Sequence, residues 1–501
     1  MWLFVLGLLV AGGIVMEKKH PQVCSVMILL AIAAVGAFRL SLSELGRFVF
    51  EEPWSGVETR MVVVTEPVVI GKVLQFEGLA YDVRNVEAAN GTRMRISVLR
   101  DTITKRYEGI HIGDGIAAKI DVTPLENWHR LDSHFDYMRW LRVRNISCWA
   151  FVPIGKWEKE EWRKEDIGTF ETMKLKALVF RQKILERIEW TGMEHDAFAV
   201  ATAMALGNKG ALTTELKEEY SISGASHVLA LSGVHLFIIY MLLTMFVRKR
   251  RIAGSAVLIV LIWGYVLLTG MPISLVRAAG MLTIWEVLQM VDKRQKSLNV
   301  LGFTACVMVM VNPQSVWDVG FQMSFASVLA IISLKGVFKD IMPEKWKYKN
   351  KKERKRQTKT EQRMYGALRK GWMTVAISLS AQVGVMPLSA YYFGRIPLLF
   401  VVTNLVVMFV ISPMVGLTML MALLCAVDVL MDLPGGGATY WLGAVLNWMV
   451  GRLNAVLGWI AGLPFASVEG VDVGLGMLVL IYALIIAGVV YANRRRLRGV
   501  L

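Results

Sequence analysis

Long apolar runs separated by short polar connections dominate the chain. Two runs stand at residues 1–16 and 22–40, and nine more follow residue 223. Most of them approach the length of about 20 residues that a helix needs to cross a bilayer. The pattern predicts a polytopic α-helical membrane protein with about eleven spans.

The nine later runs follow one another closely: 224–247, 252–270, 273–291, 298–311, 318–334, 372–393, 397–412, 414–431 and 474–492. Two points stay open in this series. The join at Ser412 and Pro413 either separates two spans or kinks a single helix. Residues 441–460 fit an interfacial or a re-entrant segment.

Between residues 41 and 166 the long runs give way to short segments in which apolar and polar positions alternate. These segments lie at 73–83, 93–99, 116–122 and 146–152. Alternation of this kind is typical of half-buried strands, and turn signals such as Asn90-Gly91 separate them. We expect an OB-like β domain, with residues 135–143 as a short helix.

A polar-faced helix is expected directly after the β domain. From residue 171 to 190, apolar side chains such as Leu178 and Ile188 share one arc, with Lys183 and Glu186 opposite. The pattern indicates an interfacial helix, in which Arg181 would snorkel out of the apolar arc. The expected organisation is therefore two N-terminal helices (1–40), the β domain (41–166), the interfacial helix (167–193), a transmembrane domain (194–493) and a basic tail (494–501).

Composition and charge support a membrane protein and orient it. The chain is 55% hydrophobic and 19% charged, whereas soluble domains are about 45–50% apolar and about 25% charged. Its net charge of +16 is concentrated: residues 335–370 hold fourteen Lys/Arg against four Asp/Glu, a local charge of +10. Basic connections face the cytoplasm. Since Lys18 and Lys19 follow the first run, the N-terminus and the β domain are expected outside and the C-terminus inside.

Three segments place polar groups within or beside apolar runs, where side chains that face lipid are normally apolar. Residues 223–236 contain two Ser-Gly pairs with His227 and His235, and Arg277 follows a tight turn at the start of another span. Residues 312–324 add Asp318, a candidate partner for Arg277. Intramembrane polar groups usually face a bundle interior or a water-filled cavity. A structural role between helices and a functional role are equally compatible with these residues.

Taken in order, these three segments resemble the core signature of the ComEC competence family. The resemblance covers roughly residues 1–490 and implies a bacterial inner-membrane channel that imports single-stranded DNA. The residues that it assigns to a polar channel are His227, Ser232, Gly233, His235, Arg277, Asn312, Asp318 and Gln322. Its implied partners are single-stranded DNA, membrane lipids, a separate nuclease, a DNA receptor, and a cytoplasmic helicase or DNA-binding protein.

Longer members of that family carry a metallo-β-lactamase-like nuclease domain after the last span. This sequence reaches Leu501 without a His-x-His-x-Asp-His cluster, and its seven histidines are scattered. His227 and His235 are eight residues apart, about 80° on a regular helix, which is poor geometry for a shared metal. We therefore expect no metal, no cofactor and no enzymatic activity.

The β domain gives qualified support for DNA binding. Residues 51–165 hold seventeen Lys/Arg against eighteen Asp/Glu, whereas phosphate binding needs local positive charge. A patch suited to single strands combines arginines with aromatic stacking surfaces. The candidates are Arg93, Arg95, Arg142, Arg144, Trp128 and Trp140, although such aromatic residues are more often part of a core.

Two other functions compete with a DNA channel. A membrane-embedded hydrolase could use Ser232 as the nucleophile and His235 as the base, but no third, orienting carboxylate stands near them in sequence. A lipid or solute transporter would also suit intramembrane Arg and His, although the sequence has no visible inverted repeat.

Overall fold

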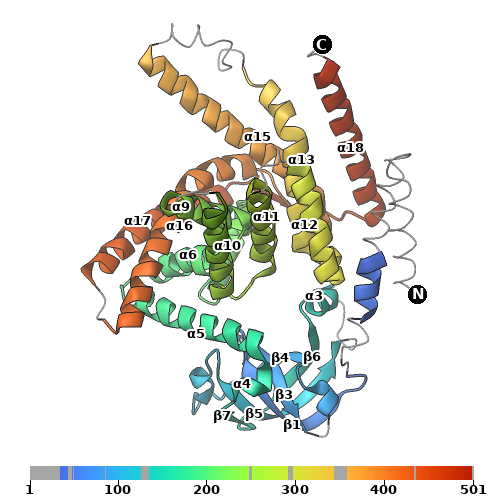
Figure 1. Ribbon diagram of the computed structural model, residues 1–501, viewed down its shortest axis with the longest axis vertical. Coiled ribbons are helices and arrows are strands. Elements are labelled where there is room, and N and C mark those ends of the chain that lie inside the picture. Colours follow the sequence, from blue (N-terminus) through green and yellow to red (C-terminus); the bar gives the residue numbers. More distant parts are fainter. Residues whose placement is uncertain are drawn as a thin grey trace.

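The computed structural model describes residues 34–42, 48, 50–84, 86–125, 135–247, 251–290, 297–343, 358–433 and 436–498. It is mostly helical, with a β domain at one end (Figure 1). Of the two expected N-terminal spans, only residues 34–42 are described, and they are helical.

The described part of the β domain contains seven strands: β1 (Trp54–Val63), β2 (Val68–Ile70), β3 (Val73–Val83), β4 (Arg93–Leu99), β5 (Gly115–Pro124), β6 (Ile146–Val152) and β7 (Trp157–Glu160). Their order is β1-β3-β4-β6-β5-β7, with β2 on β3, and a pairing of β1 with β5 closes a barrel. All pairs are antiparallel except β4 with β6. The four strands expected from the sequence are confirmed as β3 to β6.

Period-2 alternation fills this barrel. Alternate side chains of β4, including Met94 and Ile96, are fully buried, whereas Arg93 and Arg95 point out of the barrel and are only half-buried. The expected short helix is confirmed as α3 (Tyr137–Val143), capped by Asp136. The barrel therefore presents two arginines on the outer side of β4 and α3 at its edge.

The β domain is followed by the helices α4 (Lys164–Ile167), α5 (Thr169–Glu189), α6 (His195–Leu206), α7 (Thr214–Ile222), α8 (Ser226–Leu229), α9 (Gly233–Phe246) and α10 (Arg251–Leu268). They are followed by α11 (Ile273–Met290), α12 (Ser297–Val311), the 3-10 helix η4 (Pro313–Trp317), α13 (Val319–Asp340), α15 (Lys359–Phe393), α16 (Phe400–Met431), α17 (Gly437–Ala461) and α18 (Leu475–Arg498). Strands β8 (Arg395–Pro397) and β9 (Ser467–Glu469) pair antiparallel beside them.

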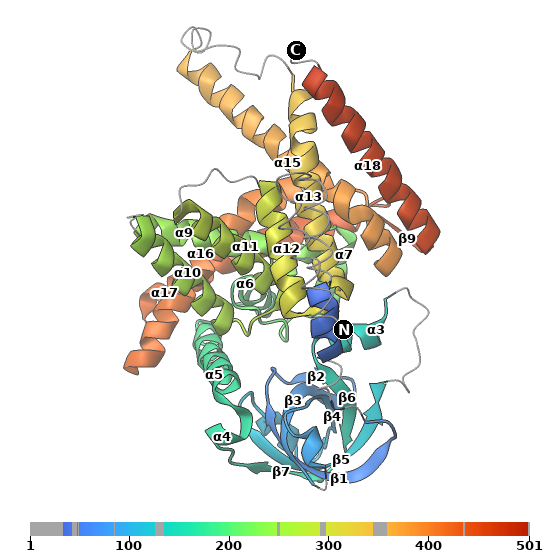
Figure 2. The ribbon, with the colours of Figure 1, turned by 45° about the vertical axis from the view of Figure 1, so that its right-hand side comes forward.

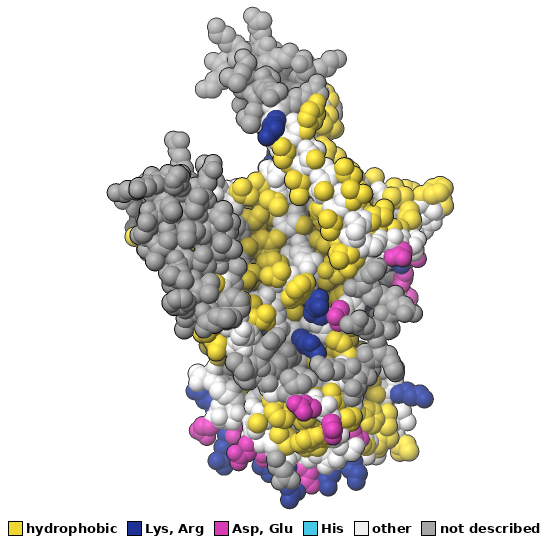
Figure 3. All heavy atoms as spheres, turned by 90° about the vertical axis from the view of Figure 1, so that its right-hand side faces the viewer, with side chains coloured by type: hydrophobic (Ala, Val, Ile, Leu, Met, Phe, Trp, Pro, Cys, Tyr) yellow, Lys and Arg dark blue, Asp and Glu magenta, His cyan; other side chains and the backbone are white. Residues whose placement is uncertain are grey.

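Six of the described helices are long and apolar enough to cross a membrane: α11, α13, α15, α16, α17 and α18. Three shorter apolar helices, α9, α10 and α12, accompany them. On the face seen in Figure 3, hydrophobic side chains cover the helical part and charged ones gather on the β domain. The chain is a multi-pass membrane protein, and the total of eleven spans remains a prediction.

Helix α5 lies between the β domain and the bundle (Figures 1 and 2). The prediction that Arg181 snorkels is wrong, because its side chain is buried and donates to the carbonyl of Leu206 at 3.3 Å. Its guanidinium also lies 3.8 Å from the Glu66 carboxylate. Arg181 therefore caps the C-terminal end of α6 and ties it to the β domain.

Three predicted spans need correction. The runs 397–412 and 414–431 form the single helix α16, which contains Pro413. The run 224–247 is interrupted, because α8 ends at Leu229 and α9 begins only at Gly233. Helices α6 and α7 were not predicted at all, although α6 is buried along nearly its whole length.

Candidate functional site

A buried ion pair joins two helices of the bundle at their ends nearest the β domain. Arg277 lies in the first turns of α11, and Asp318 is the N-cap of α13, where it accepts the backbone N–H of Phe321 at 2.8 Å. Arg277 Nη1 lies 3.4 Å from Asp318 Oδ1. Both residues are 6% exposed or less. The pair expected from the sequence is therefore present.

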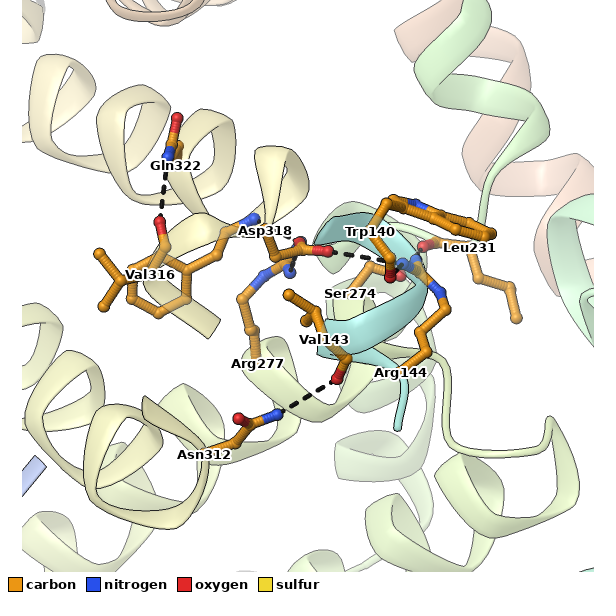
Figure 4. Close-up of polar contacts among 11 residues, drawn as sticks. Trp140, Val143, Arg144, Leu231, Ser274, Arg277, Asn312, Val316, Asp318 and Gln322 are labelled. Carbon is orange, nitrogen blue, oxygen red and sulfur yellow. Dashed lines mark hydrogen bonds and ion pairs between the residues drawn. The ribbon is translucent and has the colours of Figure 1, made fainter. Parts of the chain in front are cut away.

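The β domain supplies a second cation to the same carboxylate. Arg144 follows α3, and its Nη1 lies 3.8 Å from Asp318 Oδ2. Its guanidinium packs 3.6 Å from the Trp140 ring centroid and donates to the Trp140 carbonyl at 3.2 Å. Asp318 thus lies between Arg277 and Arg144, which approach from different elements (Figure 4). We call these three residues the charged junction.

Gly320 makes room for this arrangement. A Cβ atom at Gly320 would stand 2.9 Å from Asp318 Oδ1 and 3.3 Å from Arg277 Nη2. Distances below about 3.0 Å force a displacement, so a side chain here would push directly on the ion pair. A glycine at position 320 therefore leaves the space that the ion pair between Asp318 and Arg277 occupies.

Helix α3 is docked on η4 beside the junction. Asn312 caps η4 through its Oδ1, which accepts the N–H of Gln314, and its Nδ2 donates to the Val143 carbonyl at 3.4 Å. The Arg139 guanidinium stacks 4.6 Å above the Trp317 ring. The β domain is thus held against the loop that leads into α13.

Gln322 connects α13 with α15. Its Nε2 donates to the Val316 carbonyl at 3.0 Å, and its Oε1 accepts the hydroxyl of Tyr392 at 2.8 Å. Gln322 therefore fixes the start of α13 against the end of α15, one turn beyond the charged junction.

Ser232 and His235 form the capping box of α9. The backbone N–H of Ser232 donates to His235 Nδ1 at 3.1 Å, while Ser232 Oγ is 3.4 Å from the same nitrogen. His235 is fully buried, and its Nε2 has no hydrogen-bond partner among the described atoms. Since Nδ1 already accepts a backbone N–H, this geometry favours helix capping over activation of the Ser232 hydroxyl.

The other predicted channel residues lie nearby without joining the charged junction. Gly233 packs against α11, where a Cβ would stand 3.5 Å from that of Ala278, and Ser274 Oγ donates to the Leu231 carbonyl at 2.6 Å. His227 is exposed on α8. No polar contact between described atoms joins Ser232 and His235 to Arg277 and Asp318, so a shared polar cavity stays a prediction.

The predicted DNA-binding residues fall in two places. Arg93 and Arg95 lie on β4, where Arg93 Nη2 is 2.6 Å from Glu171 of α5 and Arg95 Nη1 is 3.6 Å from Glu77 of β3. Trp140 stacks on Tyr137 in α3 with ring centroids 5.4 Å apart, and Arg142 is exposed in the last turn of that helix. Trp128 lies outside the described residues.

Glu286 is a buried polar residue that the sequence analysis did not single out. It is fully buried in α11, where it accepts hydroxyl hydrogen bonds from Ser255 at 2.6 Å and from Tyr240. As the one carboxylate in the apolar run 273–291, Glu286 could have been predicted from the sequence as a buried polar group with partners.

The contact of Arg181 with Glu66 could not be predicted from the local sequence pattern. Burial raises the pKa of the Glu66 carboxyl, while the Arg181 guanidinium opposes that shift.

Among the described residues, no group of three or more His, Cys, Asp or Glu side chains is arranged to hold a metal ion.

A family model described as Competence protein matches residues 204–495, which is more than half of the chain and includes Arg277, Asp318 and the Ser232–His235 cap.

The chain belongs to the competence protein family.

Two curated relatives accompany this match. The ComE operon protein 3 of Bacillus subtilis (strain 168) is 24% identical over 304 residues, which make up 59% of this chain and 34% of that protein. An uncharacterized protein of Aquifex aeolicus (strain VF5) is 26% identical over 202 residues, 40% of this chain and 45% of that protein. The chain thus spans less than half the length of either relative. No solved structure was found to match it.

Proposed function

We propose that this member of the competence family takes part in DNA uptake as a bacterial inner-membrane channel that imports single-stranded DNA. Family membership supports a role in competence. The barrel order of the β domain supports an OB-like domain that receives the strand outside the membrane.

The observation that carries this proposal is the charged junction. Arg144 belongs to the β domain, whereas Arg277 and Asp318 belong to two helices that could span a membrane. Buried charges at membrane depth are costly and commonly mark substrate pathways. A junction that links the receiving domain to two channel helices is where a strand would pass from one to the other.

The orientation of the chain follows from its basic connections. The C-terminal ends of α13 and α18 and the N-terminal end of α15 all lie far from the β domain (Figures 1 and 2). These ends flank the basic segments 335–370 and 494–498. With that side in the cytoplasm, the β domain is outside. Helix α17 is a candidate span, whereas residues 441–460 were expected to be interfacial or re-entrant, and the single helix α16 replaces two expected spans. The nine apolar helices and the two N-terminal runs therefore still give about eleven spans.

We propose no enzymatic activity for these 501 residues. Hydrolysis of the second strand usually relies on bound metal ions, so we propose that a nuclease outside these residues supplies it, together with a DNA receptor and a cytoplasmic helicase or DNA-binding protein. The purified chain is expected to leave DNA intact in the presence of manganese, magnesium or zinc. Metal-dependent cleavage that a point change in this chain abolishes would contradict this.

A deletion strain tests the proposed function. Cells that lack the gene should fail to bring labelled DNA into a form protected from added DNase, and a plasmid copy of the gene should restore protection. DNA binding at the cell surface should persist in the mutant, because the channel acts after capture. Equal protection in deletion and complemented cells would overturn the proposal.

A further inference from the structure

The outer face of β3 and β4 is turned toward the helical part of the molecule. In both ribbon views these strands lie closer to the bundle than β1, β5 and β7 do (Figures 1 and 2). Arg93 of β4 contacts Glu171 of α5 at 2.6 Å, so α5 borders this face. In OB-type barrels the face of the second and third barrel strands binds nucleic acid. Here β3 and β4 are those strands, and their face is enclosed.

A second boundary of the enclosed space is the loop after α6. A Cβ at Gly210 would stand 3.5 Å from the Glu66 carboxylate, so this loop touches the connection between β1 and β2. Its neighbour Lys209 is exposed, yet burial of its ammonium by surrounding protein, followed by the charges of Arg144 and Lys217, lowers its pKa. The influence of Arg144 places Lys209 on the side of this loop that faces the charged junction.

We define the interdomain recess by five cations: Arg93, Arg95, Arg144, Lys174 and Lys209. Each of the three arginines has a carboxylate within 4 Å, namely Glu171, Glu77 or Asp318. Among the described residues, neither lysine has one.

Lys174 lies among charges of both signs. It is half-buried on α5, and burial, followed by the charge of Arg93, lowers the pKa of its ammonium, whereas the Glu171 and Glu77 carboxylates oppose that shift. The five cations face three carboxylates, Glu171, Glu77 and Asp318, and Asp318 is shared with Arg277. The recess therefore holds an excess of positive charge in partly desolvated surroundings, which favours the binding of an anion.

Solvent reaches the edge of this recess. A cleft of about 580 Å³ opens beside Arg93, and its lining also includes the carboxylates of Asp166 and Glu171 and the amides of Asn145 and Gln314. It runs between the β domain, α5 and the η4 segment that leads to the charged junction. A strand in this position would move from the barrel face toward Asp318 without crossing the outside of the barrel.

The opposite side of the barrel is electrostatically balanced. Its cleft of about 830 Å³ is lined by Arg60, Arg84, Lys119 and their partners. Arg84 and Lys119 both pair with Glu58, and Arg60 pairs with Glu160 at 3.2 Å. Because these surface charges are paired, they create little positive potential to attract phosphates. We therefore expect no DNA path on this side of the barrel, and its lysines can serve as control positions.

We propose that the phosphates of the incoming strand bind in the interdomain recess, where Lys174 and Lys209 contact them before the strand reaches the charged junction. This inference rests on the function proposed above and adds a route and two residues to it.

Fluorescence anisotropy with the full chain in neutral-lipid nanodiscs tests the route. The probe is a fluorescein-labelled dT30 oligonucleotide, titrated over a series of salt concentrations. Each lost phosphate contact to a single strand should lower the salt slope by about 0.7. The double variant Lys174→Gln/Lys209→Gln should therefore lose about 1.4 from the slope and bind roughly tenfold more weakly at low salt.

Two further variants make the result specific. Lys119→Gln/Lys156→Gln removes the same charge from the outer side of the barrel and should bind like the wild type. Lys174→Arg/Lys209→Arg keeps the charge and should restore the slope, which separates lost contacts from misfolding.

Wild-type binding that the glutamine variant fully retains would overturn the inference and leave the proposed function standing. If the glutamine variant binds dT30 normally but the detergent-solubilised variant binds anionic-lipid vesicles more weakly than the wild type does, the recess binds lipid headgroups and the inference is also overturned. Absence of dT30 binding by the wild type would instead count against the proposed function itself.

Discussion

Single residues decide how the β domain is coupled to the bundle. Asp318 serves three groups: the N–H of Phe321, the guanidinium of Arg277 and that of Arg144. The N-cap role needs only an oxygen acceptor, whereas the two ion pairs need a negative charge. The roles can therefore be separated by substitution.

Asp318→Asn should keep the cap and lose the charge. Because Asn caps helices about as well as Asp, the variant should remain in the membrane. Two unneutralised arginines should nevertheless disturb the junction, since breaking a buried pair costs about 3–5 kcal/mol. DNase-protected uptake is expected to fall severely, and quantitative blotting of membranes checks insertion.

Asp136→Asn is the matched control, because Asp136 also caps a helix but lies near the surface and pairs only weakly, at 3.9 Å, with Arg139. It should behave like the wild type. Normal uptake by a well-inserted Asp318→Asn protein would show that the negative charge at the junction is dispensable.

Sequence reasoning found the pair of Arg277 and Asp318 because each charge lies in or beside an apolar run and is costly there without a partner. It did not place Arg144 with them. That contact depends on how α3 docks on η4, and docking between domains leaves no local pattern. Lys174 and Lys209 were missed for the same reason.

At the scale of elements, close packing of α13 and α15 depends on a glycine. A Cβ at Gly384 in α15 would stand 2.5 Å from the Ala326 carbonyl oxygen and 2.8 Å from the Ala330 Cβ in α13. Both helices are candidate spans, and small residues let such helices approach closely. The two helices therefore share an interface with no space for a methyl group.

Gly384→Ala should separate these helices and destabilise the protein by about 1–3 kcal/mol, the usual cost of overpacking. Gly371→Ala is the control in the same helix, because nothing lies within 4 Å of its added Cβ. That change should be neutral or stabilising, since Ala favours a helix over Gly. Thermal unfolding in detergent measures both, and equal melting temperatures would refute the close contact.

The hydrophobic pattern predicted most of these elements. It failed where a buried helix was too short to suggest a span, and where a proline or a polar interruption lay inside an apolar run. Helix α6 has only twelve residues and is surrounded by protein, so its run did not suggest a span. Pro413 looked like a boundary, yet α16 continues through it. The interruption before α9 comes from Ser232 and His235, whose mutual hydrogen bond starts a new helix inside one apolar run.

For the whole molecule, the proposed orientation places the β domain outside the membrane and the basic segment 335–370 in the cytoplasm. A cysteine at Lys119 on the β domain should react with a membrane-impermeant maleimide added to intact cells, and a cysteine at Lys359 should not. Both positions are exposed. The four native cysteines would first be replaced by serine or alanine. Labelling of the Lys359 position before lysis would reverse the topology.

Passage of a single DNA strand through the reconstituted protein would show whether this chain is itself the channel. Proteoliposomes would enclose a quenched probe that fluoresces on hybridisation, and protease digestion of a separate sample would measure the fraction of molecules whose β domain faces outward. An external complementary single strand is expected to enter, a duplex is not, and Asp318→Asn should lower the entry rate. Entry no faster than into protein-free vesicles would mean that the chain forms no channel for DNA.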